Sequence, residues 1–150
     1  MRAIVQRVTG AHITINQNTE RQIGSGVLIL VGIEESDEKK DAEWLSGKIS
    51  RLRIFNDSSG VMNLDLKEVG GEVMIVSQFT LHASTKKGNR PSYIRAAPPE
   101  IAVPLYKEFI KQMEVDAEQP IVTGEFGAHM QINLTNDGPV TIMIDTKNKE

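Results

Sequence analysis

The sequence Glu72-Val73-Met74-Ile75-Val76 leads directly into Ser77-Gln78-Phe79-Thr80-Leu81. The first stretch is rich in β-branched residues and follows the turn signal Gly70-Gly71, so it predicts a strand. The second stretch begins where that strand ends and where backbone N–H groups are no longer all used by a sheet. Two hydroxyls, an amide and an aromatic ring are therefore expected beside free N–H groups.

The strands on either side of this junction are predicted from alternation and apolar runs. Residues 2–8 and 11–16 alternate around Thr9-Gly10, and residues 27–33 are almost continuously apolar, so three strands are expected to open the fold. Further strands are predicted near Ile121 and over residues 130–134 and 140–144, which alternate again.

Two helices are predicted from apolar spacing. Ser36 or Asp37 can cap the first, whose apolar positions recur every three or four residues: Ala42, Leu45, Ile49 and Leu52. The second follows Pro98-Pro99, with one apolar face made of Ile101, Leu105, Phe109 and Met113. Pro104 lies inside this pattern, and a proline removes a helix hydrogen bond. The second helix is therefore expected either to kink or to begin at Pro104.

Length and element order predict one domain over residues 1–150 of the α+β class. A chain of 150 residues can bury most of its apolar surface in one core. Two helices are too few to cover both faces of a parallel sheet, which argues against an α/β fold.

The composition excludes several classes of protein. The chain has no cysteine, which excludes disulfides, a thiolate nucleophile and a zinc–thiolate site. It opens on a strand pattern rather than a leader sequence, and no apolar run approaches the roughly 20 residues that span a bilayer. A cytoplasmic location with no membrane partner is expected.

Charge is distributed unevenly. The net charge of −3 argues against a generic nucleic-acid binder, yet residues 83–99 carry no acid and four bases: Lys86, Lys87, Arg90 and Arg95. This segment is either a solvated loop or a phosphate-contacting one.

Metal and nucleotide sites are not predicted. His12, His82 and His129 are scattered without ligand spacing, and the chain has neither a dinucleotide fingerprint nor a phosphate-binding Gly-Lys-Thr/Ser motif, so no cofactor is expected. His82 lies close to Thr80, which leaves a Ser/His/Asp hydrolase as an enzymatic alternative. That alternative is weak, because Val76-Ser77-Gln78 is not a nucleophile elbow.

A second motif, Asn136-Asp137-Gly138-Pro139-Val140-Thr141, is a turn signal between the last two predicted strands. Taken alone, its Gly-Pro bond is expected to be trans, because only about 5–6% of X–Pro bonds in folded proteins are cis.

Together the two motifs resemble those of D-aminoacyl-tRNA deacylases. The resemblance covers most of the chain, because it extends in the same order to residues 2–8, 53–57, 62–63 and 88–93. It implies three layers, with mixed β-sheets packed on each other and two main helices outside. It also implies a homodimer with active sites at the subunit interface, acting on the aminoacylated 3′ end of tRNA.

The resemblance assigns roles to particular residues. It implies a catalytic group of Ser77, Gln78, Phe79 and Thr80, and a cis Gly138-Pro139 turn that enters the partner's active site and excludes L side chains. Arg7 would hold this turn in orientation, Asn136 belongs to the same motif, and Met130 is expected to line the pocket. The resemblance also favours Lys86, Lys87 and Arg90 as tRNA contacts.

The chemistry required is modest. An aminoacyl ester is labile, so an enzyme needs position and an oxyanion hole more than a strong nucleophile. The N–H groups near Phe79 and Thr80 are candidate donors. Thr80 is either a nucleophile or a positioning hydroxyl, and the second role is favoured because no adjacent base is evident.

The predicted function is hydrolysis of D-aminoacyl-tRNA, and of glycine mischarged to tRNA, by attack of water. Glycine has no side chain for a steric filter to exclude. Two alternatives stand beside this prediction. The first motif can be a plain strand-to-turn transition with a buried phenylalanine, and the protein can be a non-catalytic RNA-binding module that uses its basic segment and Tyr93.

Overall fold

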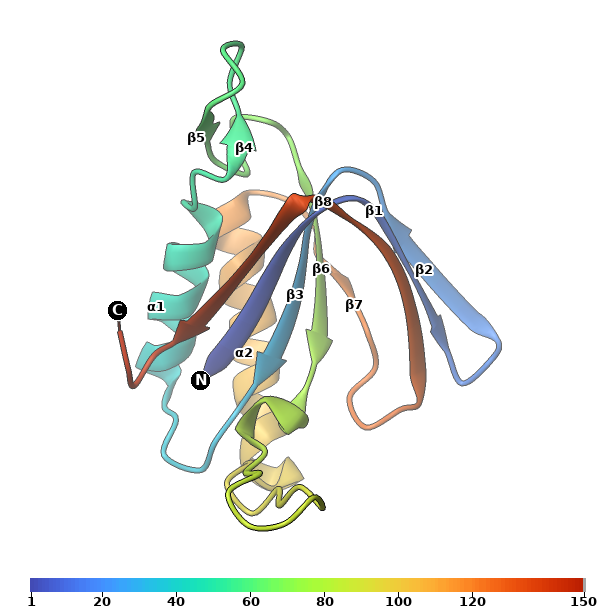
Figure 1. The fold of residues 1–150 in the computed structure, drawn as a ribbon, viewed down its shortest axis with the longest axis vertical. Coiled ribbons are helices and arrows are strands. Elements are labelled where there is room, and N and C mark those ends of the chain that lie inside the picture. Colours follow the sequence, from blue (N-terminus) through green and yellow to red (C-terminus); the bar gives the residue numbers. More distant parts are fainter. Residues whose placement is uncertain (150) are drawn as a thin grey trace.

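β1 (Arg2–Ile15) is the strand on which the main sheet is built, because it pairs with three others. Along one edge it pairs antiparallel first with β3 (Gly26–Gly32) and then with β2 (Thr19–Ile23). Along the other edge it pairs with β8 (Met130–Asp145) over nearly its whole length. The computed structural model in Figure 1 describes residues 1–149.

The remaining strands make the sheet mixed. β6 (Glu72–Ser77) lies parallel to β3, and β7 (Val122–Thr123) lies parallel to β6. A small hairpin of β4 (Phe55–Asn56) and β5 (Met62–Leu64) stands apart at one end of the molecule (Figure 1). The helices are α1 (Lys39–Ser50) and α2 (Pro99–Ala117), with one 3₁₀ turn, η1 (Phe79–His82).

The main sheet folds over on itself at an irregularity in β1. Its register with β8 shifts between Gln6 and Val8 and again between Val8 and Gly10. An extra residue reverses which side chains face inward. Ala3 and Val5 therefore pack toward the helices, whereas residues 11, 13 and 15 pack into a second core between the two halves of the sheet.

Three layers result, as the resemblance implies, and the α+β prediction is confirmed. The two β layers are halves of one folded sheet, which Figure 1 shows as the sharp bend of β1 and β8. The predicted strand at residues 11–16 is the second half of β1, and the strand that follows it, β2, was not predicted. Residues 130–134 and 140–144 likewise belong to the single strand β8.

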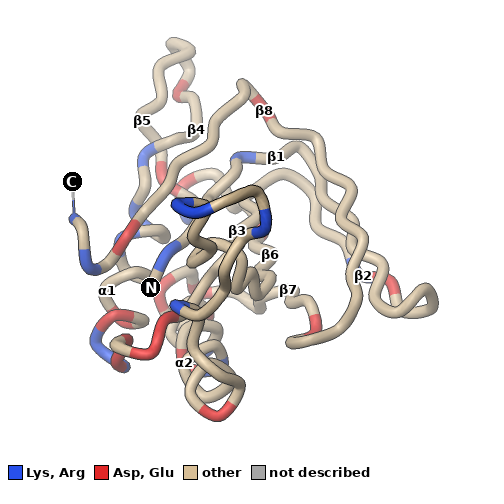
Figure 2. Tube along the Cα trace, turned by 60° about the horizontal axis from the view of Figure 1, so that its bottom comes forward, with Lys and Arg blue, Asp and Glu red and all other residues tan. Residues whose placement is uncertain are grey.

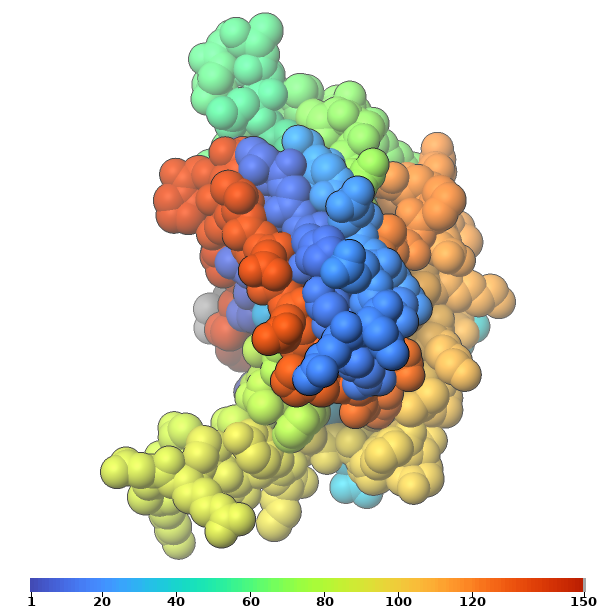
Figure 3. All heavy atoms as spheres, turned by 90° about the vertical axis from the view of Figure 1, so that its right-hand side faces the viewer, coloured from blue at the N-terminus to red at the C-terminus, as the bar shows by residue number. Residues whose placement is uncertain are grey.

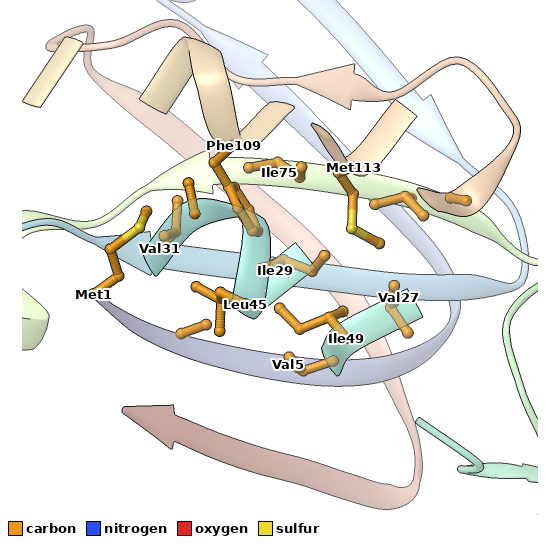
Figure 4. Packing of buried hydrophobic residues seen from close by; sticks show 14 of the residues in the cluster. Met1, Val5, Val27, Ile29, Val31, Leu45, Ile49, Ile75, Phe109 and Met113 are labelled. Carbon is orange, nitrogen blue, oxygen red and sulfur yellow. The ribbon is translucent and has the colours of Figure 1, made fainter. Parts of the chain in front are cut away.

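The helical layer packs on β3 and β6 around fully buried side chains. Figure 4 shows Leu45 of α1 and Phe109 and Met113 of α2 lying over the face of β3 that carries Val27, Ile29 and Val31. Each such side chain stabilises the fold by about 1.5–3 kcal/mol.

The start of α1 differs from the prediction, whereas α2 begins at the predicted Pro98-Pro99. The N-cap of α1 is Glu38, in a reciprocal capping box in which the Asp41 carboxylate accepts from the Glu38 N–H at 2.9 Å. Asp37 is instead buried and accepts from the Glu34 N–H at 2.8 Å. Helix α2 begins at Pro99 and contains Pro104, so a start at Pro104 is wrong.

The buried face of α2 is also rotated from the predicted one. Phe109 and Met113 are buried as expected, but Ile101 and Leu105 are only partly buried at the margin. Tyr106 lies in the core because its hydroxyl donates to the Ile75 carbonyl at 3.1 Å, a partner that helical periodicity cannot reveal. Over residues 1–149, no helix is long and apolar enough to cross a membrane.

Candidate active site

The first motif forms a tight turn at the end of β6. The sheet makes its last bond there when the Gln78 N–H donates to the Val31 carbonyl at 2.7 Å. The chain then turns into η1, in which Leu81 donates to Gln78 at 3.2 Å and Ala83 donates to Thr80 at 3.0 Å.

Two backbone donors are left over at this turn. The first N–H groups of a 3₁₀ turn have no carbonyl behind them to bond. Those of Phe79 and Thr80 accordingly have no protein partner within residues 1–149. The site thus presents two adjacent N–H groups, which is the arrangement that an oxyanion hole requires.

The side chains of the motif surround these donors. The Gln78 amide donates to the Thr80 hydroxyl, so one lone pair of Thr80 is used while its own proton remains available. The Phe79 ring is 55% exposed and meets Tyr93 edge to face at 5.1 Å between centroids. The alternative of a buried phenylalanine is therefore wrong.

A nucleophilic relay is not assembled at the turn. In the part of the chain that the structure describes, neither Ser77 nor Thr80 is hydrogen-bonded to a histidine or a carboxylate. His82 is fully buried at the far end of η1. Thr80 consequently has no base to activate it, which agrees with a positioning role.

A small cavity opens behind the turn. It measures about 20 Å³, room for roughly one water molecule. Its lining is Val31, Ile33, Ser77, Gln78, Phe79, Ala97, Ala102 and Phe126. A large substrate side chain does not fit into this space and must lie outside it.

The second motif forms a braced turn inside β8, where the Gly138–Pro139 peptide bond is cis. The Asn136 side-chain amide donates to the carbonyls of Arg7 and Val140, both at 2.9 Å, and its oxygen accepts from Thr141 at 3.1 Å. One asparagine thereby ties the two ends of the turn together and to β1.

Arg7 supports the same turn from the other side. Its buried guanidinium donates to the Ile54 carbonyl at 2.6 Å, and its Nε lies 3.0 Å from the Asp137 carboxylate. Gly138 has φ +117°, and a Cβ there would lie 3.1 Å from Nη2 of Arg7 and 2.9 Å from Val140. The turn requires glycine at this position.

The two motifs lie far apart on the sheet. Arg2 pairs with Gly32 at the end that carries Ser77, whereas Val8 pairs with Asn136 at the bend of the sheet. Six residues of strand separate these positions, a distance of about 20 Å. In Figure 1 the bend of β8 and the η1 turn are correspondingly far apart.

Met130 packs between the halves of the sheet, where its sulfur would lie 2.6 Å from a Cβ on Gly124. It is not part of the cavity lining.

The basic segment projects from the site. Ser84 and Ser92 exchange backbone hydrogen bonds at 2.8 and 2.9 Å, which makes residues 85–91 a protruding loop (Figure 3). Lys86, Lys87 and Arg90 are exposed on it, and Figure 2 shows a loop with blue segments projecting toward the viewer. Arg95 instead faces Glu34 at 4.0 Å.

Arg2 was not predicted as part of the site. Its guanidinium donates to the Leu81 carbonyl at 3.0 Å and pairs with Asp145 at 2.8 Å, which ties η1 to the ends of β1 and β8. No local sequence signal could have identified Arg2, because its partners Leu81 and Asp145 are 79 and 143 positions away along the chain.

Comparison with known proteins identifies the family that this architecture matches. The model of the family described as D-Tyr-tRNA(Tyr) deacylase matches residues 4–145. Proteins named D-aminoacyl-tRNA deacylase from Bacteroides thetaiotaomicron and Parabacteroides distasonis are 61% and 57% identical over 150 residues, covering all of each chain.

Two solved structures share the fold. The c-Myc DNA Unwinding Element Binding Protein is 40% identical with a TM-score of 0.89, covering 97% of this chain and 98% of that one. A probable eukaryotic D-amino acid tRNA deacylase, at 17% identity and a TM-score of 0.82, covers 95% and 97% and shows the fold alone.

The chain belongs to the D-Tyr-tRNA(Tyr) deacylase family. It is accordingly an enzyme, a hydrolase of the D-aminoacyl-tRNA deacylase type, and the non-catalytic RNA-binding alternative is set aside.

Proposed function

We propose that the protein hydrolyses the ester of D-aminoacyl-tRNA, and of glycine mischarged to tRNA, at the turn formed by Ser77, Gln78, Phe79 and Thr80. The observation that carries the proposal is the pair of N–H groups of Phe79 and Thr80 at the end of β6, which have no partner among residues 1–149. No metal or organic cofactor is required.

Water attacks the ester carbonyl, and the two N–H groups stabilise the oxyanion, with an effect of about 3 kcal/mol per preorganised donor. The Thr80 hydroxyl, held by Gln78, donates to the substrate. Ser77 orients the terminal ribose, and the vicinal ribose hydroxyl assists departure of the alkoxide.

Chirality is read by the turn at Gly138-Pro139. Its carbonyl groups occupy the space that an L side chain needs, while glycine has no side chain to exclude. Asn136 and Arg7 hold those carbonyls in place, and Met130 packs in the second core between the halves of the sheet.

The turn acts in a second subunit. Because about 20 Å of strand separates it from the Phe79 N–H of its own chain, a filter at this turn requires a homodimer with composite active sites. One exposed apolar side chain fits this assembly, since Met143 is 72% exposed on the side of the sheet away from the helices.

The projecting loop binds the tRNA. Lys86, Lys87 and Arg90 contact phosphates near the aminoacylated 3′ end, which places the ester at the turn. The two cores share β1, β3 and β6, so residues 1–150 act as one domain. We place the enzyme in the cytoplasm, where tRNA is charged and where a chain without cysteines needs no oxidising environment.

The reaction is tested with matched D- and L-aminoacyl-tRNA and with glycyl-tRNA. Release of D-amino acids and glycine, with the L ester left intact, is expected. Hydrolysis of D and L esters at equal rates would contradict the filter, and inactivity toward all three would contradict the reaction.

The composite site is tested by complementation between Phe79→Pro, which removes one N–H donor, and Gly138→Ala, which disturbs the turn. A mixed dimer contains one intact composite site only if the turn acts across subunits. Recovery of D-selective activity after coexpression is expected. If both sites were made within one chain, coexpression would restore nothing.

A further inference from the structure

His82 is a buried side chain for which the proposed mechanism has no use. It closes η1 and is fully inaccessible to solvent, yet within residues 1–149 neither ring nitrogen has a hydrogen-bond partner. Buried polar atoms are nearly always paired, so an unpaired imidazole next to a candidate active site requires an explanation.

The ring lies where η1 rests on β3. A Cβ on Gly32 would lie 3.0 Å from Cδ2 of His82 and 2.8 Å from the Gln78 carbonyl oxygen. Only glycine allows so close an approach of the turn to the strand. On the other side, Arg2 holds the Leu81 carbonyl at 3.0 Å. The conformation of η1 is thus fixed by contacts at Gly32, His82 and Arg2.

The charges that face the ring make its protonation unfavourable. Burial is the main cause that lowers the pKa of His82, and the Arg2 guanidinium and the Met1 amino group act in the same direction. The nearby Gly32 backbone acceptor opposes them, and so does Glu34, whose carboxylate also faces Arg95. Arg2 itself is paired with Asp145. The ring is therefore neutral near pH 7.

We propose that His82 is a positioning residue whose neutral ring packs η1 against β3, so that the Phe79 and Thr80 N–H groups stay aligned as oxyanion donors. Protonation of the ring displaces the turn from β3. This inference rests on the proposed function. It makes the deacylase self-limiting in acid through a residue that does not touch the substrate.

The physical reason is the shortage of acceptors around the ring. An imidazolium has two N–H donors, and within residues 1–149 neither ring nitrogen makes a hydrogen bond at its present place. The Gly32 backbone is the nearby acceptor that favours the charged ring, and it can serve only one of the two donors. A buried, unpaired charge is costly, so the protonated ring moves toward water. The Ala83 N–H is bonded to the Thr80 carbonyl, so this movement pulls on the catalytic turn.

The test compares kcat and KM for D-aminoacyl-tRNA from about pH 5 to 8 in the wild type and in His82→Leu, which cannot titrate. Taking the ratio of the two kcat values cancels the titration of the substrate. At neutral pH the ratio is expected to stay within about threefold, and as the pH falls the wild type is expected to lose kcat progressively relative to the variant, with similar KM. His12→Gln and His129→Gln, at two more exposed histidines, are matched controls that should follow the wild type.

A ratio that does not change with pH would overturn the proposal, as would a uniform loss of kcat in His82→Leu at every pH. If the variant fails to fold, NMR of the wild type decides. The Phe79 and Thr80 amide resonances should shift at the midpoint at which the His82 ring titrates, and amides unaffected by that titration would refute the switch. A wild type inactive at every pH would refute the proposed function, while the NMR result would still decide whether His82 controls the packing of η1 on β3.

Discussion

The Arg7 guanidinium lies 3.0 Å from the carboxylate of Asp137, the residue immediately before Gly138. The same guanidinium donates to the Ile54 carbonyl at 2.6 Å. One buried cation therefore connects the turn in β8 to the segment that leads into the β4–β5 hairpin, so the turn is held by a neighbour that is itself fixed.

Replacing Arg7 by Lys keeps the charge but removes the planar fork that reaches both partners. Because a buried carbonyl loses its donor, the free energy of unfolding should fall by about 1–3 kcal/mol, and rejection of L-aminoacyl-tRNA should weaken. Urea unfolding and paired D and L assays measure these effects. Arg53→Lys, at an exposed arginine bonded to Asn63, is the matched control. Equal effects of the two changes would contradict a special role for Arg7.

Gly138→Ala places a methyl group 2.9 Å from Val140 and 3.1 Å from Arg7 at a φ of +117°. We expect a stability loss of about 1–3 kcal/mol together with reduced D-selective activity, because the turn must shift. Gly127→Ala, at φ +78° with nothing within 4 Å, carries the backbone strain without the clash. Its activity should be unchanged, and a Gly138→Ala enzyme with wild-type selectivity would argue against the filter.

Thr80→Val keeps the shape of the side chain and removes its hydroxyl. If Thr80 only positions the substrate, kcat should fall by no more than about tenfold, which corresponds to the loss of one hydrogen bond. Single-turnover deacylation measures the change. Complete inactivation, or a covalent acyl group found on Thr80 of the wild type by mass spectrometry, would instead assign it as the nucleophile.

Changing Lys86, Lys87 and Arg90 together to Ala should weaken tRNA binding and leave the fold intact. Three lost phosphate contacts should reduce the slope of log affinity against log salt by about two to three units. Filter binding at several salt concentrations gives this slope. A control triple variant changes three exposed lysines of the helices to Ala: Lys40, Lys107 and Lys111. An unchanged slope would make the basic segment a solvated loop.

Asp41 gives a pH-dependent contribution to stability. Burial acts to raise its pKa, but hydrogen bonds from Lys147, at 2.8 Å, and from the Glu38 N–H outweigh burial and lower it to about 2. A lowered pKa stabilises the fold above the unfolded value of 3.8, and the effect disappears as the pH falls through about 2.

Asp41→Asn should consequently cost about 2 kcal/mol at pH 7 and progressively less as the pH falls from about 4 to 2. Urea unfolding of both proteins across this range is the measurement. A difference that does not depend on pH would show that the carboxylate charge is not what stabilises the helix cap.

Local pattern was sufficient for the elements that repeat a simple period. The apolar spacing of Ala42, Leu45 and Ile49 identified the buried face of α1, and the β-rich run before Ser77 identified the strand end that frees the N–H groups of Phe79 and Thr80. Such signals arise between residues a few positions apart, so a single sequence contains them.

The chain order also determined that the fold is α+β, but not how the strands join. Two register shifts beside Val8 lie where two predicted strands merge into β1, and the inward face of the strand reverses there. Only the pairing with β8, more than 120 residues away, reveals it, because register is set by both strands at once.

By itself, the sequence determined that the chain contains two motifs, each on its own strand-to-turn junction, with a glycine where the backbone needs one. The tertiary structure alone decided that one motif lies at an end of the sheet and the other at its bend, and that Arg7, Arg2 and His82 support them. The physical reason is that a motif is encoded by neighbours along the chain, whereas its distance from another motif is fixed by strand register and by side chains that reach across it.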